Sequence, residues 1–202
     1  MEKTEDSILR LFLYNYKLKF NEVERLLKQR SNKIAYHIKN LVKRGILEKK
    51  EGYYFLNDNS EYLIPYLSDK SSVLPVILIC IGDSKKAFLF KREKRPFKNL
   101  LSLPGGRLLL GESIEKATSR IMKEKFNLDV KFKKINLILL EHVIKNNKIL
   151  HSFLLIAINA KTKDKLELTD IKDNKKKIIS SDYNILNSRT GKININTIKT
   201  KI

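Results

Sequence analysis

The feature that most constrains the fold is an amphipathic segment at residues 31–45, followed at once by the pattern of a short hairpin. The apolar side chains of this segment have the i, i+4, i+7 and i+8 spacing of one buried helix face, at Ile34, Ile38, Leu41 and Val42. We expect Ser31 or Asn32 to cap the helix and Gly45 to end it, since these residue types favour those positions. The segment therefore predicts a helix that packs one face against a core.

Two further helices and a hairpin complete this part of the chain. One helix is expected at residues 6–16, and Asn21 is expected to cap another that carries Val23, Leu26 and Leu27. Short apolar runs at 46–49 and 53–56 enclose a turn with Gly52, which predicts a hairpin. Residues 1–58 are thus expected to form a small domain of three helices and a hairpin.

The third helix also carries polar side chains that we expect on a second face. They are spaced i, i+3, i+4, i+7 and i+11, at Lys33, Tyr36, His37, Asn40 and Arg44. Cationic and amide side chains in such a stripe are suited to base edges and phosphates. His37 taken alone has a simpler reading, because a histidine on an exposed helix face is more often solvated than functional.

The basic charge is concentrated on this helix and the hairpin. The chain has a formal net charge of +20, which attracts polyanions, although an AT-rich genome also produces Lys-rich chains. Residues 28–50 hold eight basic residues and one acidic residue, whereas the rest of residues 1–70 holds six basic and nine acidic. This placement favours nucleic acid as the partner.

The segment 20–56 resembles the winged helix-turn-helix of bacterial and archaeal transcription regulators. The resemblance implies that residues 31–45 form a recognition helix for the DNA major groove and that residues 46–56 form the wing. The DNA-binding residues expected from it are Arg30, Asn32, Lys33, Tyr36, His37, Asn40, Arg44, Lys49 and Lys50. A module that docks or dimerises proteins is the alternative.

A change of composition at residues 59–72 predicts a linker, and a second domain is expected at 73–202. Strands are expected at 76–81, 87–90, 100–103, 130–132, 137–143 and 151–160, with helices at 112–126 and 178–186, and a weak strand or frayed tail over the final dozen residues. This order of elements predicts an α/β fold with a mixed sheet.

Residues 104–128 resemble the Nudix box, and the surrounding strand order extends the resemblance over about 73–190. The box pattern is a Gly, five residues, a Glu, seven residues and Arg-Glu-apolar-X-Glu-Glu-X-Gly-apolar. Its matching positions are Gly106, Glu112, Arg120, Glu124 and Leu128, preceded by Leu103, Pro104 and Gly105. The resemblance implies an α/β/α sandwich with a cleft for nucleoside diphosphate derivatives.

The metal-binding positions of the box depart from the family pattern. The three glutamates that hold Mg²⁺ or Mn²⁺ in the family correspond to Ile121, Glu124 and Lys125, so their charge of −3 becomes 0. We expect no catalytic residues and no metal here, unless Glu115 or Glu141 supplies a missing ligand. Glu124 has an alternative role in an i, i+4 ion pair with Arg120.

A cleft without a metal still has groups that suit a phosphate, because the ammonium of Lys125 is a point charge for an anion. The expected ligand-binding residues are Gly105, Gly106, Arg107, Glu112, Arg120, Glu124 and Lys125. His151 and Ser152 are weaker candidates for the same cleft, and a surface role is the alternative for both.

These features predict a DNA-binding transcriptional regulator whose impaired Nudix domain senses a nucleotide-like or phosphorylated metabolite or mediates dimerisation. A homodimer is expected, because helix-turn-helix proteins usually read two half-sites. The alternative is a Mg²⁺-dependent Nudix hydrolase with an accessory winged helix, and a third option is a binding module for protein or RNA. The single cysteine, Cys80, and the lack of a long apolar segment predict a cytoplasmic protein with no membrane partner.

Overall fold

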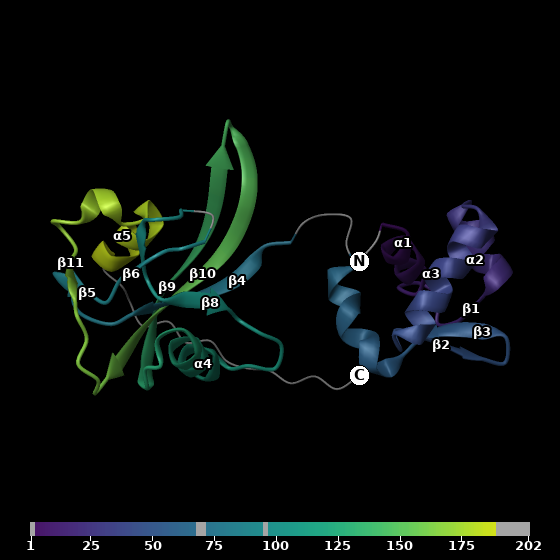
Figure 1. Ribbon diagram of the computed structural model, residues 1–202, viewed down its shortest axis with the longest axis horizontal. Coiled ribbons are helices and arrows are strands. Elements are labelled where there is room, and N and C mark those ends of the chain that lie inside the picture. Colours follow the sequence, from purple (N-terminus) through teal and green to yellow (C-terminus); the bar gives the residue numbers. More distant parts are fainter. Residues whose placement is uncertain (1–2, 68–71, 95–96, 189–202) are drawn as a thin grey trace. The chain divides into compact units, whose positions relative to one another are not determined.

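The computed structural model describes residues 3–67, 72–94 and 97–188. The chain divides into two compact units, Met1–Ser71 and Ser72–Ile202 (Figure 1). The strand or frayed tail expected at the C-terminus lies outside the described residues. No described helix has both the length and the apolar character needed to cross a membrane.

The first unit packs three helices against a small antiparallel sheet. The helices are α1 (Lys3–Leu11), α2 (Phe20–Leu27) and α3 (Ser31–Lys43). The strands β1 (Leu18–Lys19), β2 (Leu47–Lys50) and β3 (Tyr53–Leu56) are arranged in the order β1-β3-β2. The core joins all three helices through Ile8, Leu9, Val23, Ile34, Ile38 and Leu41. Three helices and a hairpin are as predicted.

The helix boundaries differ from the predicted ones for local reasons. The first helix ends at Leu11 rather than at residue 16. The second begins before Asn21, and the carboxylate of Glu22 accepts a hydrogen bond from the Lys19 backbone N–H at 2.7 Å, which satisfies a free donor at this helix start. The third begins at Ser31, and its N-cap position is occupied by Arg30, so the predicted cap at Ser31 or Asn32 is wrong. Gly45 has φ +68°, as expected of a residue that ends a helix.

The segment expected as a linker at 59–72 is mostly part of the first unit. A 3-10 helix, η1, spans Asp58–Tyr66, and Leu67 is buried against the core of the helices. This apolar contact extends the first unit past residue 58, and the two units divide between Ser71 and Ser72.

The second unit is built on a mixed four-stranded sheet in the order β8-β4-β10-β9. Its strands are β4 (Leu74–Cys80), β8 (Gly105–Arg107), β9 (Val130–Lys145) and β10 (Lys148–Thr162). The pair of β4 and β10 is parallel, and the other pairs are antiparallel. Two short pairs accompany it: β5 (Lys86–Ala87) with β11 (Thr169–Asp170), and β6 (Phe90–Lys91) with β7 (Leu101–Ser102).

Helices cover both faces of this sheet and give an α/β/α sandwich. Helix α4 (Ile114–Phe126) packs Ala117, Ile121 and Met122 on one face, and its N-terminus is capped by the hydroxyl of Ser113, which accepts from the Lys116 N–H. A short 3-10 helix, η2 (Lys175–Lys177), precedes helix α5 (Ser180–Asn187), which packs Ile185 on the other face. The mixed α/β fold is as predicted.

The hairpin of β9 and β10 is longer than predicted. The two separate strands expected at 130–132 and 137–143 form the single strand β9, because irregularities in its pairing with β10 let one strand continue across the gap. Asn146 and Asn147 turn the chain with φ values of 50° and 57°, a conformation that asparagine tolerates. The hairpin extends beyond the rest of the sheet (Figure 1).

Candidate nucleic-acid interface and ligand cleft

The exposed face of α3 lies opposite the residues that this helix buries in the core. Ile34, His37, Ile38 and Leu41 are its buried residues. Because a helix turns about 100° per residue, the opposite face is centred on four exposed residues, which we call the α3 ridge: Asn32, Tyr36, Lys39 and Lys43. Tyr36 is 60% exposed at the middle of the α3 ridge. The ridge therefore presents two cations, an amide and a phenol to solvent.

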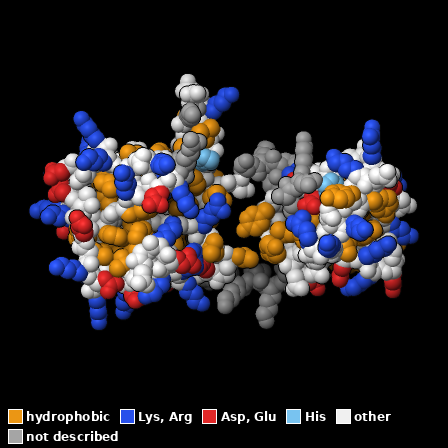
Figure 2. Space-filling view, in the orientation of Figure 1, with side chains coloured by type: hydrophobic (Ala, Val, Ile, Leu, Met, Phe, Trp, Pro, Cys, Tyr) orange, Lys and Arg blue, Asp and Glu red, His pale blue; other side chains and the backbone are white. Residues whose placement is uncertain are grey.

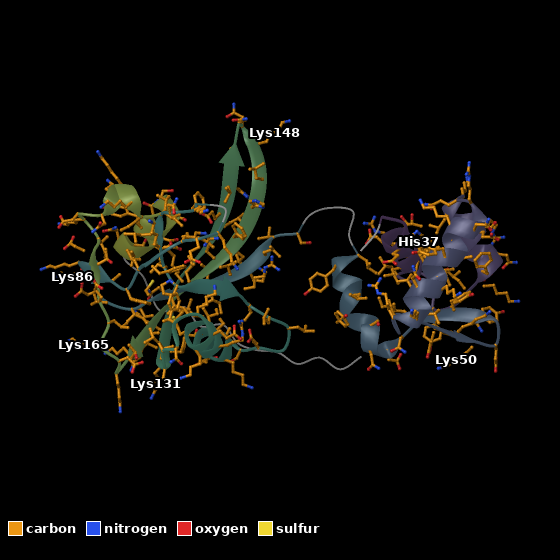
Figure 3. The ribbon with its side chains drawn as sticks, in the orientation of Figure 1. His37, Lys50, Lys86, Lys131, Lys148 and Lys165 are labelled. Carbon is orange, nitrogen blue, oxygen red and sulfur yellow. The ribbon has the colours of Figure 1, made fainter. Side chains whose placement is uncertain are left out.

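The structure corrects the prediction for His37. Its side chain is buried, with Nδ1 3.9 Å from Oε1 of Glu5 on α1, and Figure 3 shows it on the part of α3 next to α1. Arg44 donates from Nη1 to the other carboxylate oxygen of Glu5 at 2.8 Å. A buried carboxylate needs such partners, so His37 does not belong to an exposed DNA-binding face, and the guanidinium of Arg44 has a structural partner.

The polar face predicted from the sequence, from Lys33 to Arg44, is thus rotated around α3 toward α1 relative to the α3 ridge. Of its members, Lys33 and Tyr36 are exposed, Asn40 is half-buried and His37 is buried. Lys39 and Lys43 were missed as site residues, although a helical projection of the apolar positions Ile34, Ile38 and Leu41 places both of them opposite the core. Val42, which was expected in the core, is 36% exposed.

The two lysines of the β2–β3 hairpin have different surroundings. The Lys50 ammonium donates to the carboxylate of Glu48 at 2.8 Å, and this bond raises the pKa of Lys50. The Lys49 ammonium lies over the Tyr54 ring, 5.5 Å from its centroid. Both lysines are exposed, and Arg30 and Asn32 are exposed as well. Lys50 therefore has an acidic partner on the hairpin, whereas Lys49 contacts an aromatic ring.

The second unit contains a cleft of about 780 Å³. It is lined from β4, β8, β10, the β6–β7 region and α4 by Leu74, Val76, Leu78, Phe90, Arg92, Ser102, Leu103, Gly105, Gly106, Arg107, Lys125, Leu150, His151 and Phe153. Four of the seven predicted ligand residues line it, namely Gly105, Gly106, Arg107 and Lys125, together with the weaker candidate His151. Its wall combines apolar strand residues with three cations.

The two glycines allow the chain to pack closely at the cleft wall. A Cβ on Gly105 would lie 2.7 Å from the carbonyl oxygen of Ile77, and one on Gly106 would lie 3.0 Å from Cγ1 of Ile121. Side chains at these positions would push β8 away from β4 or from α4. The glycines therefore set the shape of the cleft through packing.

Lys125 is the cleft residue whose electrostatics are most altered. Its ammonium donates to the carbonyl oxygen of Gly105. Burial lowers the pKa of Lys125, and the positive charge of Arg92 lowers it further. These two cations share the cleft wall, and an anion between them would relieve their mutual repulsion.

The remaining predicted ligand residues form an ion-pair network outside the cleft lining. Arg120 donates to both carboxylate oxygens of Glu112, at 2.9 Å from Nη2, and to Glu124 at 3.3 Å. The bond from Arg120 lowers the pKa of Glu112. Arg120 also donates to the carbonyl oxygen of Arg107 at 3.0 Å, so the network attaches α4 to β8. Glu112, Arg120 and Glu124 thus have structural roles.

These residues do not fit a divalent metal ion. At the first of the three expected ligand positions, Ile121 is fully buried in the core under α4. At the third, Lys125 places a positive charge. Glu124 shares Arg120 with Glu112. Hard cations require several free carboxylate oxygens, and one carboxylate already bonded to a guanidinium beside an ammonium is a poor set of donors.

A buried aspartate beside the cleft was missed by the sequence analysis. Asp182 on α5 accepts hydrogen bonds on Oδ2 from the Leu103 N–H at 2.8 Å and from the Ser102 hydroxyl at 2.9 Å. Burial raises the pKa of Asp182 to about 6. The residue lies 79 positions after Leu103 in the chain, so no local pattern connects the two. Asp182 fixes the strand that leads into the glycines of the cleft.

The fold and site define the second unit as a mixed α/β domain with a cation-lined cleft. Solved structures similar to it include a MutT protein from Bacillus halodurans, with 18% identity over 57% of this chain and 81% of that chain and a TM-score of 0.44. A MutT protein from Methanosarcina mazei has 13% identity over 59% and 94%, with a TM-score of 0.46. The Nudix domain of Shewanella oneidensis NrtR, complexed with ADP ribose, has 14% identity over 62% and 94%, with a TM-score of 0.43. No family model and no curated protein matches the sequence.

Proposed function

We propose that this protein is a DNA-binding transcriptional regulator whose first unit is a winged helix-turn-helix and whose second unit is a Nudix-like domain that binds a phosphorylated ligand without hydrolysing it. The observation that carries the DNA-binding part is the α3 ridge. The ridge stands opposite the core on the third helix, and its amide, phenol and ammonium groups are of the kinds that contact base edges and phosphates. A homodimer in the cytoplasm belongs to the same proposal, because paired half-sites need two such helices.

The cleft of the second unit supports the ligand-binding part of the proposal. Lys125, Arg107 and Arg92 bring positive charge to one wall, whereas Val76, Leu78 and Phe153 supply an apolar surface. A nucleotide-like molecule combines an anionic phosphate with a flat or weakly polar body, so it matches both parts of this lining.

The second candidate is a Nudix hydrolase acting on a nucleoside diphosphate derivative. The size of the cleft favours it, but the donor set on α4 opposes it, since Glu112 and Glu124 are bonded to Arg120. Incubation of the protein with ADP-ribose and Mg²⁺, followed by chromatography for AMP, separates the two candidates. Turnover that a chelator abolishes would favour the hydrolase.

The DNA-binding part is tested by fluorescence titration of genomic fragments, including the protein's own upstream region, at two salt concentrations. The double variant Tyr36→Ala/Lys43→Gln removes two members of the α3 ridge and should weaken binding to a preferred fragment at least tenfold. Lys116→Gln, an exposed lysine on α4, is the charge-matched control and should bind as the wild type does. Equal and weak binding to every fragment, unaffected by the double variant, would contradict the regulator.

The ligand-binding part is tested by calorimetric titration with ADP-ribose, which offers a diphosphate and two riboses. Lys125→Gln removes an ammonium from the cleft wall and should lower the affinity about tenfold or more, as expected for a lost charge-assisted hydrogen bond. Lys123→Gln is the matched control, because Lys123 lies on the same helix and pairs with Asp129 at 3.1 Å. Equal affinities for the wild type and Lys125→Gln would argue against a phosphate at this position.

A further inference from the structure

A second concavity lies in the second unit, at the other end of β10 from the ligand cleft. The cleft takes Leu150, His151 and Phe153 near the start of β10, whereas the second concavity takes residues 159–162 near its end. Its volume is about 550 Å³, and its other walls come from the end of β4, the first part of β9 and the segment that follows β10. We call it the β9–β10 groove, and it shares no lining residue with the cleft.

One row of side chains crosses three strands in the β9–β10 groove. Asn159 of β10 is the register partner of both Cys80 on β4 and Lys134 on β9, and directly paired residues share a face of the sheet. Lys161 lies two residues after Asn159, so its side chain is on the same face. Two ammonium groups and an amide are therefore neighbours on one surface.

A β-bulge adds Lys133 to this surface. The pairing of β9 with β10 shifts by one position between Asn159 and Ala160, which leaves Lys133 as an extra residue in β9. Successive residues of a regular strand point to opposite faces, yet Lys133 and Lys134 both line the groove. A bulge re-aims side chains in this way, and bulges are frequent next to functional sites.

The charges of the groove are three ammonium groups and one carboxylate, at Lys133, Lys134, Lys161 and Asp164. Within the described part of the chain, no carboxylate forms an ion pair with any of these three lysines. The carboxylate of Asp164 accepts hydrogen bonds from the Thr162 hydroxyl at 3.1 Å and from the Asp129 N–H at 3.3 Å. The acid therefore stabilises its own turn, and the three lysines retain their charge for a ligand.

An amide and two leucines complete the lining. The side-chain oxygen of Asn159 accepts from Nδ2 of Asn136, so the amide N–H groups of Asn159 remain as donors for the groove. Leu166 and Leu168 line the groove from the segment after β10, and Leu168 is 38% exposed. The groove thus combines cationic and amide donors with an apolar edge.

Positive charge alone does not define this site, because Lys and Arg side chains project from many places on the second unit (Figure 2). The β9–β10 groove differs in its concave shape, in the row of register partners and in the bulge that turns a further lysine into the same space. Its volume is in the range of pockets that enclose small molecules.

We propose that the β9–β10 groove binds a small molecule that carries two or more phosphate groups, at a site separate from the ligand cleft. Three ammonium groups beside one carboxylate favour an anion with several negative charges. Phosphate oxygens are strong acceptors for lysine, and the bonds are charge-assisted. The inference goes beyond the proposed function, because the groove requires neither DNA nor a ligand in the cleft.

Calorimetric titration of the full-length protein with inorganic pyrophosphate, in the presence of a chelator of divalent metal ions, tests this inference. Lys134→Gln removes an ammonium from the row and should lower the affinity about tenfold or more, as expected for a lost charge-assisted hydrogen bond. Lys134→Arg keeps the charge and should bind more tightly than Lys134→Gln. Lys131→Gln is the matched control, because Lys131 is exposed on the same strand and does not line the groove. Thermal unfolding without pyrophosphate checks that each variant remains folded.

The outcomes separate the β9–β10 groove from the other places where an anion can bind. A loss in Lys134→Gln with wild-type affinity in Lys131→Gln would support the site. Equal losses in these two variants would overturn it, since they would show a general attraction of anions to the positive surface. Wild-type affinity in Lys134→Gln would also overturn it, and a loss confined to Lys125→Gln would assign the pyrophosphate to the ligand cleft. If the wild type bound no pyrophosphate at low salt, the inference would be overturned and the regulator, which is tested with DNA, would be unaffected.

Discussion

Glu5 on α1 connects this helix to α3. Its carboxylate is buried between α1 and α3, close to His37 and bonded to Arg44. A buried carboxylate is tolerated only when such groups compensate its desolvation. Because His37 and Arg44 contact Glu5 on α1, neither side chain is part of the α3 ridge.

Replacement of this carboxylate should destabilise the first unit. Glu5→Gln removes the charge that bonds Arg44 and should lower the free energy of unfolding by about 1–3 kcal/mol, the range for a broken, partly buried charged hydrogen bond. Asp6→Asn is the control, because Asp6 pairs with Arg10 at a more exposed position and such pairs contribute about 0–1 kcal/mol. Urea denaturation measures both, and equal losses would contradict the role of Glu5.

Asp182 should make the stability of the second unit depend on pH. Burial raises its pKa from 3.8 to about 6, so the folded state disfavours the ionised carboxylate. The contribution of Asp182 to the free energy of unfolding is therefore fully present below pH 3.8. It is lost as the pH rises through about 6, and the free energy of unfolding falls by roughly 3 kcal/mol.

The variant Asp182→Asn tests this linkage, because an amide accepts the same hydrogen bonds and does not ionise. Its free energy of unfolding, measured by urea denaturation from pH 4 to pH 7.5, should decline less than that of the wild type over this range. Asp173→Asn, at an exposed position, should keep the wild-type decline. A steep decline in Asp182→Asn would show that another group is responsible.

At the scale of elements, α4 packs against the sheet as an ordinary amphipathic helix. Ile121 faces the sheet and is fully buried, and Arg120 attaches the helix to β8 through the carbonyl oxygen of Arg107. Helix α4 therefore contributes the ammonium of Lys125 to the lining of the cleft.

A glutamate at position 121 of this helix should destabilise the protein rather than create a metal site. Ile121→Glu places a carboxylate in the core and should lower the free energy of unfolding by about 3–5 kcal/mol. Ser119→Glu adds the same charge at an exposed position of α4 and should change it by less than about 0.5 kcal/mol. Thermal melts with and without Mg²⁺ measure both effects, and a melting point of Ile121→Glu that rises with Mg²⁺ would show that a site had formed.

At the scale of the whole molecule, the proposed regulation requires a free-energy coupling between the two units. Such a coupling is reciprocal, so a ligand that changes the affinity for DNA by some factor has its own affinity changed by DNA by the same factor. ADP-ribose and a preferred DNA fragment should show this equality in paired titrations. Lys125→Gln should bind DNA but lose the response to ADP-ribose, and unequal factors would contradict the coupling.

The sequence by itself determined the order of elements and the main sites of charge. Apolar spacing was sufficient for the third helix and Gly45 for its end, because helix periodicity and backbone preference are local properties. The resemblance of residues 104–128 to the Nudix box had pointed to Gly105, Gly106 and Lys125, which the structure places in the cleft lining. The boundary near residue 58 was less accurate, because Leu67 joins the core through a contact that composition does not encode.

Only the tertiary structure decided which polar side chains are exposed and which are bonded to partners within the protein. The sequence around His37 suggested an exposed helix residue, but its side chain is buried beside Glu5 of α1. Lys39 is one of the residues that form the exposed α3 ridge instead. Asp182 on α5 bonds Leu103, and Glu112 and Glu124 are bonded to Arg120 and do not line the cleft. The physical reason is common to these cases: a charged group is governed by the partners that folding brings near it, and those partners come from distant parts of the chain.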